Sequence, residues 1–296
     1  MKLSILIVNY NTEKFICDLL LSLENQTFHK SDYEIIIVNN IQNSKLDEMI
    51  KNHCFEDKFN LRIINSDDNI GFGRAMNLGF RCAKGEHVLL MNPDIKMRQD
   101  DYLQNLLNFA HKNNNYGIIS TRVLDDNNND TSTYYSYEFG QTLGFDGQIC
   151  WFQGSLLLIR HEIFKQLDGF DDDFFMYCED VDLCLRVKKL GLDLLKNDDL
   201  EVYHFGGASE PNHNYDYYLR YYKSRFLFAK KHYQDDIFAD LIDKFYQKTR
   251  SRIVFYQILS LMFKKYQRHY LKNKVTYDIC HKIKQQGTNW LVYSPN

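Results

Sequence analysis

The stretch LSILIVN, residues 3–9, is an almost unbroken apolar run that is rich in Ile and Val and stops at Asn9. Such a run, without alternation of polar and apolar residues, is typical of a strand that is buried on both faces. The next segment, residues 13–26, instead spaces its apolar side chains as an amphipathic helix does. A buried strand followed by a covering helix predicts the first unit of a parallel sheet with helices on both faces.

The same alternation continues along the chain. Strands are predicted at residues 33–40, 61–65 and 86–92, and helices at 44–54 and 73–84. Further on, the pattern predicts helices at 100–114, 161–167 and 180–190, strands at 116–121, 154–160 and 200–205, and amphipathic helices over most of 214–285. We therefore predict an α/β fold in which a parallel, Rossmann-like sheet precedes a C-terminal helical extension.

Composition and charge narrow the class of protein. The 296 residues are 44% hydrophobic and 25% charged, which is ordinary for a globular protein with a core. The net charge of −3 hides an asymmetry, because residues 244–296 hold eleven Lys or Arg and one acidic residue, whereas residues 1–243 hold 25 basic and 38 acidic ones. We expect this basic C-terminal region to contact an anionic membrane surface or a second subunit, or to be exposed to solvent.

The cysteines and the apolar runs indicate the compartment. Seven cysteines, scattered and without a C-x-x-C pair, are typical of a reducing compartment and argue against a zinc cluster or a disulfide scaffold. No signal peptide is expected, because the first apolar run ends at Asn9. The longest later apolar stretch, residues 253–263, is too short to span a bilayer. We therefore expect a cytoplasmic protein.

Four predicted strands end in polar residues. These ends are Asn9-Tyr10-Asn11, Asn39-Asn40, Asn65 to Asn69, and Asn92-Pro93-Asp94. The carboxyl ends of parallel strands lie at one edge of a sheet, and open α/β sheets bind ligands at that edge. We therefore expect a ligand site formed by these four segments.

The segment Asn92-Pro93-Asp94 carries two oxygen ligands at the end of a buried strand. Such ligands suit Mg²⁺ or Mn²⁺ shared with a diphosphate, although the same three residues also make a good turn. His204 ends the last predicted strand and can join Asp94 there, or it can be a structural histidine.

Two further segments have both a binding and a structural interpretation. The Gly-rich stretch NIGFGRAMNLGF, residues 69–80, is no dinucleotide fingerprint, because Met76 stands where the third Gly belongs. Gly71 and Arg74 could still bind a phosphate at a helix start, or form a tight turn. Trp151, just before Gly154, could be a platform for a sugar ring or a core residue.

A cluster of carboxylates follows large apolar side chains in FFMYCEDVDLCLRVKKLG, residues 174–191. Glu179 suits the start of a helix, and Asp182 is spaced to form an exposed pair with Arg186. Asp180 shares its helical face with Cys184 and should point inward. An inward carboxylate is a candidate general base.

Seven motifs in this order resemble those of family 2 glycosyltransferases with the GT-A fold, most of all bacterial O-antigen and capsule rhamnosyltransferases. They are SILIVNYNT, EIIIVNN, NIGFGRAMNLGF, LLMNPDI, GSLLLIR, GFDDDFFMYCEDVDLCLRVKKLG and VYHFGG. The resemblance covers residues 1–207, which implies a GT-A catalytic domain there. It leaves residues 208–296 as a helical, basic region that meets a membrane surface or a second subunit.

The resemblance implies an inverting sugar transfer and a role for each matching residue. Asp180 would be the base that deprotonates the acceptor, assisted by Glu179, and Asp94 and His204 would hold Mg²⁺ or Mn²⁺. Trp151 and Gly154 would meet the acceptor. The nucleotide donor would be bound by Asn9, Tyr10, Asn11, Asn39, Gly71, Arg74 and Asn92. Two of these depart from the family pattern, since Asn39 and Asn92 stand where Asp is usual.

The expected reaction moves rhamnose from dTDP-L-rhamnose to a hydroxyl of a growing cell-surface polysaccharide or a polyprenyl-diphosphate-linked acceptor. The alternatives are a UDP-sugar-dependent hexosyltransferase of the same fold and a non-catalytic carbohydrate-binding relative. The expected partners are a nucleotide-sugar donor and an oligosaccharide acceptor, with no nucleic acid. The basic C-terminal region implies peripheral contact with the inner face of the cell membrane, or a homo-oligomer.

Overall fold

A computed structural model describes residues 1–41, 45–207, 210 and 212–293 and divides the chain into two compact units. One unit comprises residues 1–172 and 179–209, and the other comprises residues 173–178 and 210–296. The chain therefore enters the second unit at residues 173–178 and returns to the first at Glu179. Two predictions, the helix start at 44 and the membrane or subunit contact from 208, begin at residues that lie outside the described ones.

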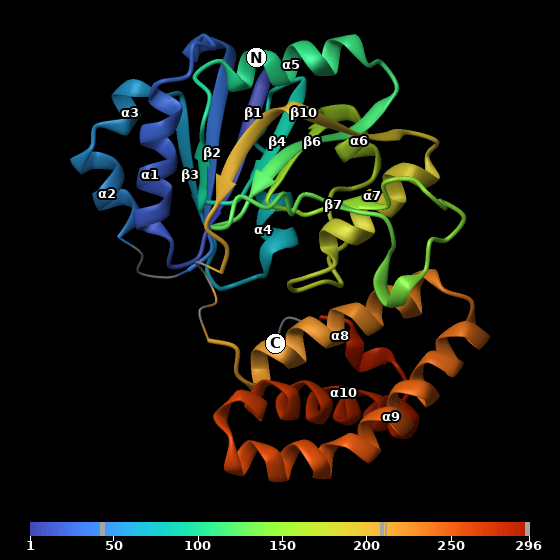
Figure 1. Cartoon of the computed structure of the whole chain (residues 1–296). Coiled ribbons are helices and arrows are strands. Elements are labelled where there is room, and N and C mark those ends of the chain that lie inside the picture. Colours follow the sequence, from blue (N-terminus) through green and yellow to red (C-terminus); the bar gives the residue numbers. More distant parts are fainter. Residues whose placement is uncertain (42–44, 208–209, 211, 294–296) are drawn as a thin grey trace. The chain divides into compact units, whose positions relative to one another are not determined.

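The first unit is built on an eight-stranded sheet with the order β3-β2-β1-β4-β9-β6-β10-β5 (Figure 1). The strands are β1 (Leu3–Asn9), β2 (Tyr33–Asn39), β3 (Leu61–Asn65), β4 (His87–Met91), β5 (Ile95–Met97), β6 (Tyr116–Leu124), β9 (Leu156–Arg160) and β10 (Asp193–His204). β1 pairs in parallel with β2 and β4, and β2 pairs in parallel with β3, which confirms the prediction for the first ninety residues.

β9 departs from the predicted parallel arrangement. It runs antiparallel to both of its neighbours, β4 and β6, and β5 is also antiparallel to β10. The side chains of β9 are buried on both faces, and such a strand has the same apolar pattern in either direction. The sequence pattern therefore predicted the strand but not its direction.

Two hydrophobic cores lie on opposite faces of the sheet, because successive residues of a strand point to opposite sides. In β1, Leu3, Ile5 and Ile7 face the core that contains residues of α1 (Glu13–Glu24), α2 (Leu46–Asn52), α3 (Phe55–Lys58) and α5 (Tyr102–Lys112). Leu6 and Val8 face the core that contains residues of α4 (Phe72–Phe80), α6 (His161–Gln166) and α7 (Glu179–Lys189). This layering places the carboxyl ends of β1, β2 and β4 at one edge of the sheet.

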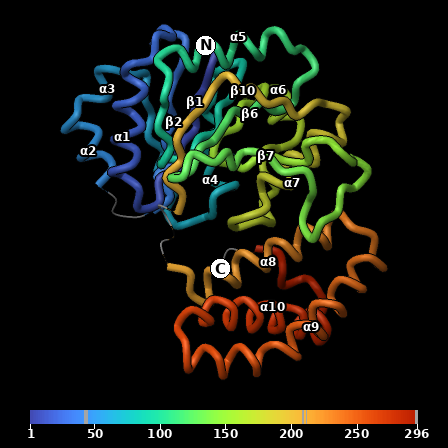
Figure 2. The backbone as a smooth tube through the Cα atoms, viewed as in Figure 1, coloured from blue at the N-terminus to red at the C-terminus, as the bar shows by residue number. Residues whose placement is uncertain are grey.

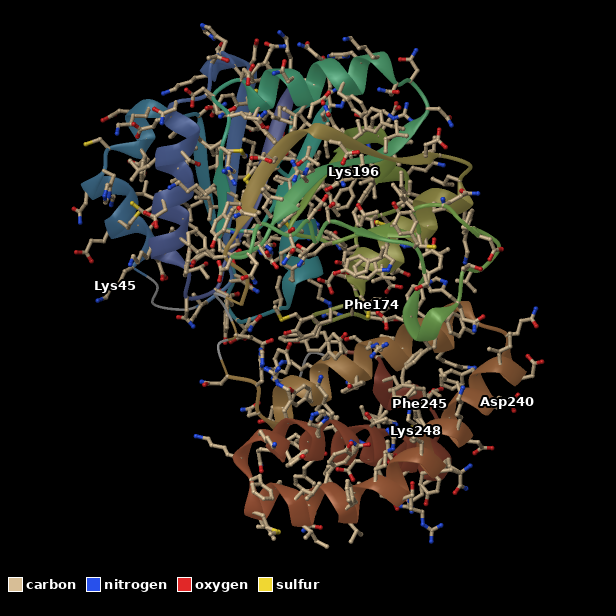
Figure 3. The ribbon with its side chains drawn as sticks, viewed as in Figure 1. Lys45, Phe174, Lys196, Asp240, Phe245 and Lys248 are labelled. Atoms are coloured by element: carbon tan, nitrogen blue, oxygen red, sulfur yellow. The ribbon has the colours of Figure 1, made fainter. Side chains whose placement is uncertain are left out.

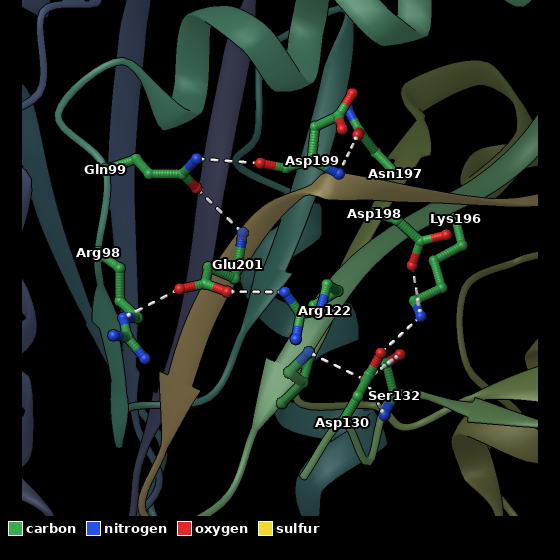
Figure 4. Close-up of polar contacts among 11 residues, drawn as sticks. Arg98, Gln99, Arg122, Asp130, Ser132, Lys196, Asn197, Asp198, Asp199 and Glu201 are labelled. Atoms are coloured by element: carbon green, nitrogen blue, oxygen red, sulfur yellow. Dashed lines mark hydrogen bonds and ion pairs between the residues drawn. The ribbon is translucent and has the colours of Figure 1, made fainter. Parts of the chain in front are cut away.

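An irregular stretch of β10 is tied to its neighbours by polar contacts (Figure 4). The register against β6 shifts between Asn197 and Glu201, and the strand begins earlier than predicted, at Asp193. The Glu201 carboxylate pairs with Arg98 at 3.3 Å and with Arg122 at 3.0 Å, while Gln99 accepts the N–H of Glu201 at 3.0 Å. These contacts join β5, β6 and β10 a few residues before His204.

The second unit is helical, as predicted, and consists mainly of α8 (Tyr215–His232), α9 (Asp235–Met262) and α10 (Gln267–Gln286). α9 and α10 lie side by side and are joined by a short turn (Figure 2). Phe245 of α9 meets Phe226 of α8 with ring centroids 5.9 Å apart, and Lys248 lies one helical turn further along (Figure 3). Within the described residues, no helix combines the length and the apolar character that crossing a bilayer requires.

Three short elements complete the first unit near the ligand edge. β7 (Thr133–Tyr134) and β8 (Trp151–Phe152) form a separate two-stranded antiparallel sheet, in which Tyr134 pairs with Trp151. A turn of 3₁₀ helix at Glu138–Gly140 lies in the connection between them. These segments lie in a part of the sequence for which the apolar pattern predicted no regular structure.

Gly117 of β6 offers a test of how closely α7 packs on the sheet. A Cβ at this position would lie 2.2 Å from Cγ1 of Val187, so Gly117→Ala forces either α7 or β6 to move. Overpacking of this kind costs about 1–3 kcal/mol, which should appear as a lower free energy of unfolding in chemical denaturation. Lys112→Ala, at an exposed position of α5, should change it by less than about 0.5 kcal/mol. Equal stabilities of the two variants would contradict this packing.

Candidate functional site

Three asparagines form a row across the carboxyl ends of β1, β2 and β3. Asn9 Nδ2 donates to Asn39 Oδ1 at 2.9 Å, and Asn39 Nδ2 donates to Asn65 Oδ1 at 2.8 Å. Asn9 Nδ2 also donates to the Glu13 carboxylate, and Asn9 Oδ1 accepts from both the N–H and the hydroxyl of Thr12. The Asn9 side chain is fully buried and its amide is used within the protein, so it positions the strand ends.

The residues around this row remain open to a ligand. Tyr10 is half-buried and Asn11 is exposed with a left-handed backbone (φ 58°). Asn39 keeps one N–H and one lone pair outside the contacts described for it, because an amide has two of each. The predicted roles of Tyr10, Asn11 and Asn39 in nucleotide binding stay predictions.

Asn40, which belongs to the predicted polar end of the second strand, fixes the Gly-rich loop. Its Oδ1 accepts the N–H of Ile70 at 3.0 Å, and its Nδ2 donates to Asn69 Oδ1 at 3.0 Å and to the carbonyl of Gly71 at 3.3 Å. Gly71 adopts φ 88° at the start of α4, a conformation that favours glycine. One turn into α4, Arg74 Nε donates to the carbonyl of Asp172 at 2.8 Å, which anchors its guanidinium.

Asn92, Asp94 and His204 lie together, as their places at strand ends predicted. His204 Nε2 is 3.3 Å from Asp94 Oδ1 and 3.4 Å from Asn92 Nδ2. Asp94 and His204 are 5% and 9% exposed, so neither is a solvated surface group. β10 runs antiparallel to β5, and this pairing sets His204 opposite Ile95.

This group has the chemistry of a small cation or diphosphate site. A carboxylate oxygen, an amide oxygen and an imidazole nitrogen are ligands that divalent metal ions accept, and the first two are typical of Mg²⁺ and Mn²⁺. The described residues contain no cluster of three or more His, Cys, Asp or Glu around one point. The residues therefore fit an ion that takes its other ligands from a substrate diphosphate, and not one held by the protein alone.

Asp180 is held at the start of α7 by two backbone donors. Its Oδ2 accepts the N–H of Gly154 at 2.8 Å and its Oδ1 accepts the N–H of Val181 at 2.8 Å. The side chain is half-buried, and burial raises the pKa of Asp180, with the backbone N–H groups opposing the rise and Glu138 adding to it. A carboxylate of raised basicity at a fixed position suits proton transfer.

Gly154 is required at this point because Asp180 lies against it. A Cβ on Gly154 would lie 2.9 Å from Asp180 Cβ and 3.1 Å from Asp180 Oδ2. The neighbouring carbonyl, that of Ser155, accepts the N–H of Asn92 at 2.8 Å. Residues 154–155 therefore connect the carboxylate of Asp180 to the Asn92, Asp94 and His204 group through two hydrogen bonds.

The two carboxylates beside Asp180 lie deeper than expected. Asp182 pairs with Arg186 as predicted, at 2.6 Å, but it is 1% exposed, so the prediction of an exposed pair is wrong. The reason is that Arg186 also donates to the carbonyls of Leu167 and Gly169, which brings a turn of the chain over the pair. The buried ion pair of Asp182 and Arg186 thus holds this turn against α7.

Glu179 is the first residue of α7 and is 7% exposed. Its Oε2 is buried and finds no hydrogen-bond partner among the described residues. Burial raises the pKa of Glu179, and the neighbouring charge of Asp180 raises it further. Glu179 therefore holds a proton at pH values where an ordinary glutamate does not.

An aromatic pair lies beside Asp180. Trp151 stacks on Tyr134 with ring centroids 3.8 Å apart and an angle of 4° between the rings, and Trp151 Nε1 donates to the carbonyl of Ser136. Burial raises the pKa of Tyr134, and the charge of Asp180 raises it further. Tyr134 is 38% exposed, and Trp151 is half-buried and packs against the hydrophobic core on one face of the sheet. The predicted acceptor role of Trp151 stays a prediction.

Comparison with known sequences and structures agrees with this geometry. The sequence model of glycosyl transferase family 2 matches residues 4–183. The low-salt glycan biosynthesis hexosyltransferase Agl10 of Haloferax volcanii is 26% identical over 89% of this chain and 85% of its own length. Rhamnosyltransferase WbbL of Escherichia coli is 28% identical over 64% of this chain and 78% of its own length.

Solved structures share the fold. The mannosyltransferase PcManGT from Pyrobaculum calidifontis, determined in complex with GDP-Man and Mn²⁺, superimposes with a TM-score of 0.61. The superposition covers 96% of this chain and 87% of that one at 14% sequence identity. This likeness establishes the GT-A fold that the motifs implied.

The burial of Glu179 predicts a pH-dependent stability. Its pKa lies above the value of about 4.3 that an unfolded chain has, so the stability it contributes is present below that value and is lost as the pH rises through the folded pKa. Glutamine does not titrate. The free energy of unfolding of Glu179→Gln, relative to the wild type, should therefore increase between about pH 5 and about pH 8. Denaturant titrations at both pH values measure it, and a constant difference would contradict the buried environment.

Proposed function

This chain belongs to glycosyl transferase family 2, and we propose that it transfers a sugar with inversion from a nucleotide diphosphate to a hydroxyl group of a glycan acceptor. The observation that carries the proposal is the fixed carboxylate of Asp180, which two hydrogen bonds connect to the Asn92, Asp94 and His204 group. The Asp180 carboxylate is suited to accept a proton, and the Asn92, Asp94 and His204 group is suited to bind a diphosphate. An inverting transfer needs both.

In the proposed step, Asp180 accepts the proton of the acceptor hydroxyl. The oxygen attacks the anomeric carbon, and the bond from that carbon to the diphosphate oxygen breaks on the opposite face, with the electron pair leaving on the diphosphate. The N–H groups of Gly154 and Val181 keep the carboxylate oriented during the transfer. Glu179, protonated in its buried position, adds no second negative charge next to Asp180 while the base is ionised.

Asn92, Asp94 and His204 would hold the leaving diphosphate and its divalent ion. When bound, Mg²⁺ or Mn²⁺ would neutralise charge on the diphosphate and so favour its departure. Asp94 would supply a carboxylate oxygen, and His204 a ring nitrogen to the ion or a ring N–H to a phosphate oxygen. Asn92 carries no charge, so this set binds a free ion more weakly than two aspartates would.

The donor that we propose first is dTDP-L-rhamnose. Its support is the named rhamnosyltransferase among the relatives and the amide of Asn39, which offers both a donor and an acceptor to O4 and N3–H of thymine or uracil. A hexosyl donor is the second candidate, because the hexosyltransferase Agl10 matches a larger share of this chain. UDP-sugars fit the same amide, so Asn39 does not separate the two.

The acceptor that we propose is a sugar hydroxyl on a growing surface polysaccharide or on a polyprenyl diphosphate. Support comes from the stacked pair of Tyr134 and Trp151 beside Asp180, since aromatic faces bind the apolar face of a sugar ring. Glu138, whose charge affects the pKa of both Tyr134 and Asp180, is a hydrogen-bond acceptor for the same sugar.

The seven cysteines are free thiols, which supports a reducing, cytoplasmic site of action.

Replacing the proposed base tests the function directly. Asp180→Asn keeps the shape of the side chain and removes the proton acceptor, so the rate of nucleoside diphosphate release in the presence of acceptor should fall about 10²–10⁴-fold. Asp18→Asn, an exposed carboxylate of α1, should leave the rate unchanged. If Asp180→Asn retains the wild-type rate while Glu179→Gln loses it, the base is Glu179 and not Asp180.

The diphosphate group makes a separate prediction about metal. EDTA should abolish transfer, and Mn²⁺ or Mg²⁺ at roughly millimolar concentration should restore it. Asp94→Asn should raise the metal concentration needed for half-maximal activity, because the only carboxylate of this group is lost. Full activity in EDTA would remove the metal role from Asp94 and His204.

A further inference from the structure

The last three turns of α9 carry large apolar side chains that the protein leaves exposed. No residue from 250 to 269 is buried. The exposed fractions are 62% for Val254, 59% for Phe255, 55% for Ile258, 84% for Leu261 and 67% for Met262, and the adjoining Phe263 is 48% exposed. Apolar side chains grouped in this way are typical of an interaction surface, whereas single exposed ones are ordinary.

These side chains form one continuous stripe along the helix. At 100° per residue, positions 254, 255, 258, 261 and 262 fall within one third of the circumference of α9. Tyr256 points elsewhere and stacks with His269 of α10, with ring centroids 5.3 Å apart. The helix therefore separates a side that faces α10 from the apolar stripe, which comprises Val254, Phe255, Ile258, Leu261, Met262 and Phe263.

The stripe is surrounded by positive charge. Residues 244–277 contain nine Lys or Arg and no Asp or Glu. Exposed basic residues flank the stripe on α9, on the turn that follows it and at the start of α10, namely Arg250, Arg252, Lys264, Lys265 and Arg268. Lys265 Nζ lies 6.0 Å from the ring centroid of Phe263 and 5.2 Å from that of Tyr266. A positive charge and two aromatic rings therefore lie together at the end of the stripe.

We propose that the apolar stripe inserts into the surface of an anionic lipid bilayer, with the surrounding Lys and Arg residues on the lipid headgroups. An apolar helix face bordered by cations is the pattern of a helix that lies in a membrane interface. A symmetric dimer through the stripe would instead place the basic residues of two copies against each other. The inference does not depend on the proposed reaction, because it concerns binding in the absence of donor and acceptor.

The test is sedimentation of the full chain with vesicles of phosphatidylcholine, with or without about 30% phosphatidylglycerol. We expect the apparent affinity for the anionic vesicles to be at least tenfold higher, and to fall steeply between about 0.1 M and about 0.5 M salt, because exposed charges are screened. Leu261→Ser with Met262→Ser should reduce binding at least tenfold, and so should Lys264→Glu with Lys265→Glu. Leu21→Ser, at an exposed position of α1, is the matched apolar control and should bind like the wild type.

Two results would overturn the proposal. One is equal binding of the wild type and the stripe variants to anionic vesicles. The other is a wild-type oligomer in size-exclusion chromatography that Leu261→Ser with Met262→Ser converts to a monomer, since the stripe would then be an interface between copies. Nucleoside diphosphate release with a water-soluble acceptor should be unchanged in the stripe variants, so a failure of membrane binding is distinguishable from a failure of the proposed reaction.

Discussion

The hydrogen bond from the N–H of Gly154 to Asp180 is the contact on which the candidate site depends. It requires a residue without Cβ at 154, because any larger side chain would collide with the carboxylate. It also fixes the start of α7 against the segment that precedes β9. Since the carbonyl of Ser155 accepts the N–H of Asn92, the same segment sets the end of β4 and so the turn in which Asp94 precedes β5. A small displacement at residues 154–155 would therefore disturb both groups at once.

The route of the chain just before α7 is unusual. Residues 173–178 belong to the helical unit, where Ser224 Oγ donates to the carbonyl of Met176 at 2.7 Å. Tyr177 and Cys178 then both adopt left-handed backbone conformations, with φ 71° and 63°, which are costly for side chains of this size. Strained residues of this kind occur at functional sites, and here they directly precede Glu179 and Asp180.

The sequence predicted most of the sheet because β1, β2 and β4 are buried on both faces and the first four strands are separated by amphipathic helices. It also predicted that Asn92, Asp94 and His204 would meet, since strand ends converge. It failed where tertiary contacts decide. The spacing of Asp182 and Arg186 predicts a pair but contains no information on the turn that covers this pair. The first half of β10 was not predicted, because the polar Asp198 and Asp199 interrupt its apolar pattern. Tyr134 could not be found, because only its pairing with Trp151 gives it a role.

Asp180 and the Asn92, Asp94 and His204 group have different proposed tasks, and the affinity for the sugar nucleotide distinguishes these tasks. Binding of the donor in the presence of Mn²⁺ should be measured by calorimetry for the wild type, Asp94→Asn and Asp180→Asn. We expect Asp94→Asn to weaken donor binding at least tenfold. Asp180→Asn should bind the donor with nearly wild-type affinity, because the base acts on the acceptor. Equal weakening in both variants, or a loss confined to Asp180→Asn, would contradict the division of roles between Asp94 and Asp180.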